Sequence, residues 1–178
     1  MNDDEIMKMV EMTLDEVYKN EEYIFVNDVC ERNLVFHFAR YFYHVYEKYN
    51  GEKNYSIDCE YNRNRSSFNE RKYKELLYDG KKHKIYPDVI LHQRGSNDNN
   101  ILAIEFKKYN NINNKEREKD FMKLEALTDR KLAYKYKLGL FIVLGKARGK
   151  VKIYKFKDGK KLGDVKRPLY FNTKLNNE

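Results

Sequence analysis

The sequence predicts an α/β fold in which a mixed β-sheet is flanked by helices. Residues 138–145, LGLFIVLG, form a continuous apolar run that is typical of a strand buried on both faces. Two further strand patterns precede it, at 85–92 and 101–108, and amphipathic helix patterns occur at 28–49 and 115–136. Because a strand buried on both faces needs cover on both sides, we expect helices to pack on each face of the sheet.

The first third of the chain is predicted to form two helices and a strand. Apolar residues recur every three or four positions in 3–18, which indicates a short N-terminal helix. The same spacing in 28–49 predicts a longer helix, with Asp28 as its N-cap. Residues 55–61, YSIDCEY, alternate polar and apolar side chains and are predicted to form a half-buried strand.

The middle of the chain combines an irregular basic stretch with a strand pair. Residues 62–84 show no clear period, and we expect a short helix near 69–78 and a turn at Asp79-Gly80. The strands IYPDVILH at 85–92 and ILAIEFKK at 101–108 are separated by Gly, Ser, Asn and Asp residues that suit a hairpin loop. They should therefore pair antiparallel.

The last third completes the element order α-β-β-β-α-β. A helix is predicted over 115–136, then the apolar strand 138–145 and a C-terminal edge strand at 151–156. At 178 residues, without a linker that would divide the chain, we expect a single domain over 1–178. Its core should span about 28–157, and the tail at 172–178 should be loose.

The composition favours an anionic partner in the cytoplasm. The formal net charge is +8, which suggests nucleic acid. No apolar run is long enough to cross a membrane, and the acidic start MNDDEIMK does not resemble a signal peptide, so no membrane partner is expected. Two cysteines, Cys30 and Cys59, are too few for a disulfide framework, which fits a reducing compartment.

Two carboxylates and a lysine stand out on the paired strands. Side chains at i and i+2 share a face of a strand, so Glu105 and Lys107 project together. If the two strands pair as a hairpin, Asp88 can lie beside Glu105. Two carboxylates about 4 Å apart repel by roughly 4 kcal/mol at an effective dielectric near 20, so such a pair usually shares a proton or binds a cation such as Mg²⁺. The alternative is a solvated ion-pair cluster on an exposed sheet face.

The order of these residues resembles the PD-(D/E)xK nuclease superfamily. Pro87-Asp88 is followed after sixteen residues by Glu105-x-Lys107, each on a predicted strand, and then by an amphipathic helix and an apolar strand. The resemblance covers roughly residues 28–145. It implies a restriction-endonuclease-like core and a metal-dependent nuclease that hydrolyses phosphodiester bonds, in DNA rather than RNA. It also implies a homodimer as a candidate assembly.

The resemblance assigns roles to individual residues. Asp88 and Glu105 would bind Mg²⁺, for which Mn²⁺ would substitute, together with the backbone carbonyl of Phe106. Lys107 would assist the attacking water, and Glu31 on the first core helix would support the metal site. Glu31 also has a competing explanation, because Asp28-x-x-Glu31 fits a capping box in which Glu31 is the third helical residue.

Basic residues elsewhere are candidates for phosphate contacts. Some relatives place a basic residue from the helix after the ExK strand near the substrate, a role that would fall on Lys123, although a surface pair with Asp120 explains it equally. Further candidates follow the first strand and the apolar strand: Arg63, Arg65, Lys146 and Arg148.

Two other functions are compatible with the sequence. One is a catalytically silent nucleic-acid-binding or regulatory domain with a nuclease fold. The other is a protein-interaction module that contacts a partner through its basic face. Salt-sensitive DNA binding without cleavage would favour the first, and no DNA binding would favour the second.

Overall fold

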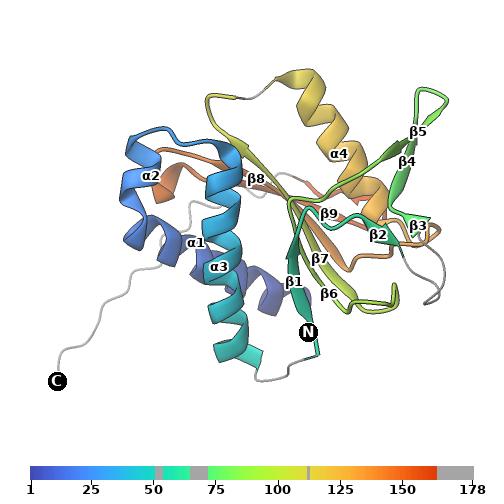
Figure 1. Ribbon diagram of the computed structural model, residues 1–178, viewed down its shortest axis with the longest axis horizontal. Helices are drawn as coiled ribbons and strands as arrows, with labels where there is room; N and C mark the ends of the chain where they lie inside the picture. Colours follow the sequence, from blue (N-terminus) through green and yellow to red (C-terminus); the bar gives the residue numbers. More distant parts are fainter. Residues whose placement is uncertain (51–53, 65–71, 112, 164–178) are drawn as a thin grey trace.

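A six-stranded mixed sheet forms the centre of the molecule. The computed structural model describes residues 1–50, 54–64, 72–111 and 113–163. The sheet order is β1-β6-β7-β8-β9-β10 (Figure 1), and only β7 and β8 are parallel among the pairs in it. The strands are β1 (Ser56–Cys59), β6 (Val89–His92), β7 (Asn100–Lys108), β8 (Leu138–Leu144), β9 (Lys152–Lys157) and β10 (Lys160–Lys161). The predicted α/β class with a mixed, helix-flanked sheet is confirmed.

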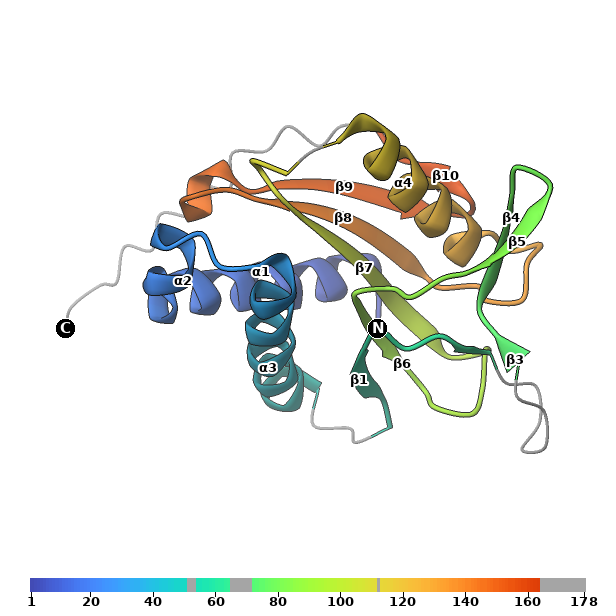
Figure 2. The same ribbon diagram turned by 45° about the horizontal axis from the view of Figure 1, so that its top comes forward.

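Helices cover both faces of this sheet (Figure 2). On one face pack α1 (Asp3–Asn20) and α3 (Glu31–Asn50), joined by the short α2 (Glu22–Val26). On the other face packs α4 (Asn114–Thr128). None of the helices in the described ranges has the length and apolar composition that crossing a membrane requires.

Strand β7 contributes to both cores through its alternation. Leu102, Ile104 and Phe106 are buried against the α1 and α3 side, whereas Ala103 is buried against α4. Glu105 and Lys107 therefore face α4 as well, and both contact its side chains. The parallel neighbour β8 is buried along its whole length, as its apolar sequence predicts.

The stretch between β1 and β6 differs from the prediction. The expected helix at 69–78 is wrong for residues 72–78, which form β3 (Lys72–Tyr73) and β4 (Glu75–Tyr78). Strand β4 pairs with β5 (Lys81–Lys84) in a hairpin, and β3 pairs with β2 (Arg63–Asn64). Asp79 and Gly80 both have positive φ, 53° and 70°, as a tight two-residue hairpin turn requires. The Asp79-Gly80 turn is thus confirmed.

Several element boundaries, and one strand's place in the sheet, also differ from the prediction. The strand predicted at 85–92 begins at Val89, and the helix predicted to run to 136 ends at Thr128. The strand predicted at 151–156 is β9, and it is not the sheet edge because the two residues of β10 pair with its outer side. Between β8 and β9 lies the 3₁₀ turn η1 (Arg148–Lys150). The tail at 172–178 lies outside the described residues.

Candidate active site

The antiparallel pairing of β6 and β7 brings Asp88 to Glu105. Val89 pairs with Ile104, so Asp88, one residue before β6, lies beside the end of β7 where Glu105 and Phe106 lie. The Phe106 amide donates a hydrogen bond to Asp88 Oδ2 at 2.7 Å. The backbone of the ExK strand therefore fixes one carboxylate oxygen of the PD motif. The structure shows Phe106 contributing its amide, and the role of its carbonyl stays a prediction.

Glu31 reaches the same end of β7 from the first turn of α3. Its Oε1 lies 3.2 Å from Lys107 Nζ, and its Oε2 accepts a hydrogen bond from the Lys108 amide at 3.1 Å. The predicted capping box is wrong, because α3 begins at Glu31 itself and Asp28 has a φ of 52°. Asp28 instead pairs with Lys108 and Asn110.

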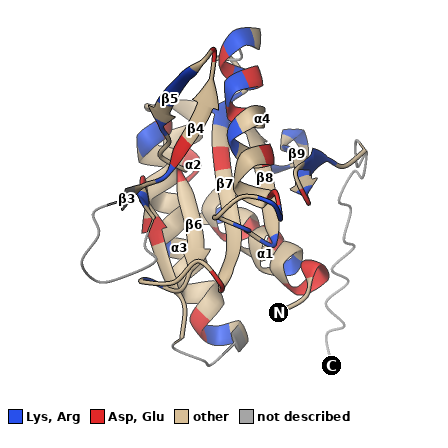
Figure 3. Ribbon diagram, turned by 90° about the vertical axis from the view of Figure 1, so that its right-hand side faces the viewer, with Lys and Arg blue, Asp and Glu red and all other residues tan. Residues whose placement is uncertain are grey.

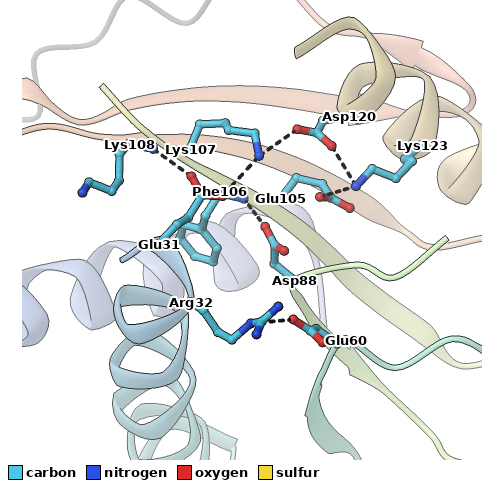
Figure 4. A network of polar contacts seen from close by, with 10 residues as sticks. All are labelled: Glu31, Arg32, Glu60, Asp88, Glu105, Phe106, Lys107, Lys108, Asp120 and Lys123. Carbon is cyan, nitrogen blue, oxygen red and sulfur yellow. Dashed lines mark hydrogen bonds and ion pairs between the residues drawn. The ribbon is translucent and has the colours of Figure 1, made fainter. Parts of the chain in front are cut away.

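Helix α4 closes the site with Asp120 and Lys123. Lys123 Nζ lies 2.7 Å from Glu105 Oε2 and 2.7 Å from Asp120 Oδ1. Asp120 Oδ2 lies 3.4 Å from Lys107 Nζ (Figure 4). The pair between Asp120 and Lys123 that the sequence suggested is therefore present, but it is not on the surface, because Asp120 is buried. The sequence did contain one signal for Asp120. It lies three residues before Lys123 on the predicted helix, and residues at that spacing share a helix face.

The two motif carboxylates resist ionisation in this environment. Burial raises the pKa of Asp88 to about 6, although the Phe106 amide and Lys123 oppose the shift. Burial also raises the pKa of Glu105 well above its usual value, and the charge of Asp88 adds to that effect. The charge of Asp88 therefore disfavours that of Glu105, and the charge of Glu31 in turn adds to the rise in the pKa of Asp88.

The two ammonium groups are held in their charged form. Burial lowers the pKa of Lys107, but the carboxylates of Asp120 and Glu31 outweigh it, and the pKa ends above its usual value. In Lys123, Glu105 and Asp120 likewise outweigh the effect of burial and raise the pKa. Lys107 is thus a hydrogen-bond donor at neutral pH and not a proton acceptor.

The oxygen atoms of the site meet some of the requirements of a hard cation such as Mg²⁺. Glu105 Oε1 is buried and has no hydrogen-bond partner among the residues that the structure describes, and carboxylate oxygens are the ligands that Mg²⁺ prefers. Within the described residues, however, no three His, Cys, Asp or Glu side chains are arranged as a group that could hold a metal ion. Asp88 and Glu105 together fit the kind of Mg²⁺ site in which one or two carboxylates share the ion with water and phosphate.

The other predicted phosphate contacts lie apart from the carboxylates. Arg63 is exposed and lies over the Tyr73 ring at 4.8 Å, and Arg148 pairs with Asp15 of α1 at 2.6 Å. Lys146 follows β8 and lies 5.8 Å from the Tyr109 ring centroid, near the end of β7. Arg65 lies outside the described residues. Lys146 and Arg148 both lie in the connection that follows β8, at the end of the sheet where Lys107 pairs with Val143.

No protein-family model, curated protein or solved structure matches this chain. The site therefore has to be interpreted from its own chemistry.

Proposed function

We propose that this protein is a metal-dependent nuclease that hydrolyses phosphodiester bonds, in DNA in preference to RNA. The observation that carries the proposal is the meeting of Asp88, directly before β6, with Glu105 of β7, both with raised pKa, with the Lys107 ammonium on the same face of β7 as Glu105. Paired carboxylates that resist ionisation are typical of cation-binding and catalytic sites.

Asp88 and Glu105 would hold Mg²⁺ or Mn²⁺, with the Phe106 carbonyl as a further ligand. A divalent cation there would neutralise charge on the phosphate and lower the pKa of a coordinated water. The Phe106 amide orients Asp88 for this role through its 2.7 Å hydrogen bond. Glu105 keeps Oε1 without a hydrogen-bond partner and gives Oε2 to Lys123.

Lys107 is the group suited to position the attacking water. Its Nζ is held between Glu31 at 3.2 Å and Asp120 at 3.4 Å, so the ammonium has a fixed place on the α4 face of the sheet. An ammonium has three N–H groups, and the third remains available to donate to a water or a phosphate oxygen. Its charge also opposes the negative charge that develops on phosphorus-bound oxygens.

The restriction-endonuclease-like core and a homodimeric assembly belong to this proposal. The core is supported by the mixed sheet with helices on both faces, by Asp88 before β6 and by Glu105 and Lys107 on β7. The homodimer is proposed from the resemblance to the nuclease superfamily alone.

A catalytically silent nucleic-acid-binding domain is the second candidate function. It is favoured by the ion pairs that Lys123 and Lys107 already make with Glu105, Asp120 and Glu31. If those pairs persist in the presence of metal, the carboxylates stay occupied and turnover is blocked.

A cleavage assay separates the two candidates. Purified protein is incubated with single-stranded, duplex and branched DNA and with RNA, in Mg²⁺, Mn²⁺, Ca²⁺ or EDTA, beside the Asp88→Ala and Glu105→Ala variants. The proposal expects cleavage that requires Mg²⁺ or Mn²⁺ and is lost in both variants while their circular dichroism spectra match wild type. An unchanged cleavage rate in either variant would contradict the assignment of Asp88 and Glu105 to the site. Salt-sensitive DNA binding without cleavage would favour the catalytically silent domain.

A further inference from the structure

The β4–β5 hairpin presents a basic strand to solvent. All four residues of β5, Lys81 to Lys84, are exposed, and the hairpin stands apart from the main sheet beside α4 (Figure 3). Leu77 pairs with Lys82, and Glu75 pairs with Lys84, so these side chains share one face of the hairpin. We call this face, together with Arg63 and Tyr73, the hairpin surface.

The positive charge on this surface is only weakly balanced. Lys84 Nζ lies 3.9 Å from the centroid of the Tyr73 ring, and Arg63 lies over the same ring at 4.8 Å, so two cations gather at one side chain. Lys82 is 75% exposed, and its Nζ lies 3.9 Å from Glu75 Oε2. Such a long, exposed pair contributes little, which leaves these groups available to an anion.

An apolar hollow adjoins these cations. Its volume is about 700 Å³, and the residues that line it include Tyr73, Glu75, Leu77, Lys82, Leu132 and Tyr134. The Glu75 carboxylate is thus one acidic group beside the Lys82 ammonium. Leu77 is 70% exposed and Leu132 is 42% exposed, so the wall of the hollow offers apolar surface to solvent. Tyr134 is held in place by the hydrogen bond that its hydroxyl donates to the Glu75 carbonyl at 2.8 Å. The hollow thus combines a fixed apolar wall with an ammonium rim.

We propose that the hairpin surface binds a single-stranded segment of nucleic acid, with one unpaired base in the hollow and its phosphates on Lys82, Lys84 and Arg63. This inference rests on the proposed nuclease function, and it specifies that the substrate reaching Asp88 and Glu105 is single-stranded. A base has an apolar face and a phosphate carries a negative charge, so the two match the wall and the rim. A duplex keeps its bases stacked and paired, and the exposed leucines would gain no base contact from it.

The hairpin also lies close to the carboxylates along the chain. Only residues 85–87 separate Lys84 from Asp88, and four extended steps span at most about 14 Å. The Ile85 amide donates to the Lys74 carbonyl at 2.9 Å, which anchors the base of the hairpin. The Lys84 end of the hairpin surface therefore lies within about 14 Å of Asp88.

The test measures binding in EDTA, where metal-dependent cleavage cannot occur. Fluorescence anisotropy of labelled 12-nucleotide DNA, RNA of the same sequence and the DNA duplex is followed with wild type, with Lys82→Gln/Lys84→Gln, and with Lys8→Gln/Lys19→Gln. The last pair removes the same charge from exposed positions on α1, across the sheet. We expect wild type to bind single strands more tightly than duplex. The hairpin variant should lose about tenfold in affinity, and its slope of log K against log salt should be shallower by about 1.4, for two lost phosphate contacts.

The apolar wall is tested separately. A 2-aminopurine base is placed at successive positions of the oligonucleotide, and its fluorescence change on binding to wild type is compared with that on binding to Leu77→Ser, a substitution at an exposed site. We expect a change at one position that Leu77→Ser reduces. Equal affinities of the two charge variants, or tighter binding of duplex than of single strands, would overturn the inference.

The outcomes keep this inference apart from the nuclease proposal. Metal-dependent cleavage with unchanged binding by the hairpin variant would overturn the inference and leave the nuclease standing. Hairpin-dependent binding of single strands without cleavage in any metal would support the inference and overturn the nuclease. Preference between the DNA and RNA strands identifies which nucleic acid the surface takes.

Discussion

Asp88 is a carboxyl group whose ionisation costs the folded protein stability. Its pKa is 3.8 in the unfolded chain and about 6 in the folded protein. Between these values the folded protein holds a proton that the unfolded chain has released, so the free energy of unfolding falls as the pH rises from about 4 to about 6 and stays low above that. The sign is opposite to that of a salt-bridged aspartate.

Replacing Asp88 with Asn should therefore stabilise the metal-free protein. Asn cannot ionise and still offers an oxygen to the Phe106 amide. We expect Asp88→Asn to raise the free energy of unfolding by about 1–3 kcal/mol at pH 7.5 in EDTA and to lose this gain near pH 4. Urea unfolding at several pH values measures it, with the exposed Asp98→Asn as control. A gain that is independent of pH would contradict the assigned cause.

Asp120 is expected to act as a positioning residue for Lys107 and Lys123. Asp120→Asn keeps the size of the side chain but removes the charge that both ammonium groups contact. If the site is a nuclease, the cleavage rate should fall by about 10- to 100-fold, because misplaced catalytic groups cost that much. Steady-state kinetics checks this beside Glu118→Gln, an exposed acid on the same helix. Equal rates in the two variants would show that Asp120 serves stability alone.

At the scale of elements, close packing of the turn after β8 depends on Gly145. A Cβ at this position would lie 2.5 Å from Lys150 Cβ and 2.9 Å from the Lys150 carbonyl carbon and oxygen, whereas one at Gly149 would meet nothing within 4 Å. Gly145→Ala should therefore cost roughly 1–3 kcal/mol and lower the melting temperature by several degrees. Gly149→Ala is the matched control in a thermal melt. Similar melting temperatures for the two variants would show that the turn can relax.

The elements that sequence patterns predicted correctly are those whose signal is local. The apolar run of β8 and the alternation of β7 depend only on the residues within each strand. The hairpin β4–β5 was missed because Glu75, Leu76 and Leu77 favour a helix, and only pairing with β5 makes them a strand. The helix α4 was extended too far because Tyr134, seven positions after Leu127, is buried and continues the helical spacing while lying in a loop.

The candidate site was predictable in part for a similar reason. Asp88, Glu105 and Lys107 follow from strand alternation and hairpin pairing, which the sequence contains. The place of Asp120 in the site does not, because its contact with Lys107, like that of Lys123 with Glu105, forms only after α4 packs over the sheet. The capping prediction for Asp28 and Glu31 was wrong because Lys108 and Asn110, about 80 positions away, bind Asp28 instead.

At the scale of the whole molecule, both cores share one sheet, so they should unfold together. Met9 is buried in the core under α1, and Leu124 is buried in the core under α4. We expect Met9→Ala and Leu124→Ala each to cost roughly 2–5 kcal/mol and to lower one common midpoint. Far-ultraviolet circular dichroism and tyrosine fluorescence would follow the two transitions. Separate midpoints would contradict a single domain over the described residues.

If the site binds divalent metal as we propose, its charge count sets an expectation for the stoichiometry. Four carboxylates, from Glu31, Asp88, Glu105 and Asp120, face the ammonium groups of Lys107 and Lys123, which leaves an excess of two negative charges when all are ionised. One divalent cation balances that excess. A second would be left without a counter-charge until a phosphate arrives, so titration should fill one site per chain in the free protein and a second only beside nucleic acid.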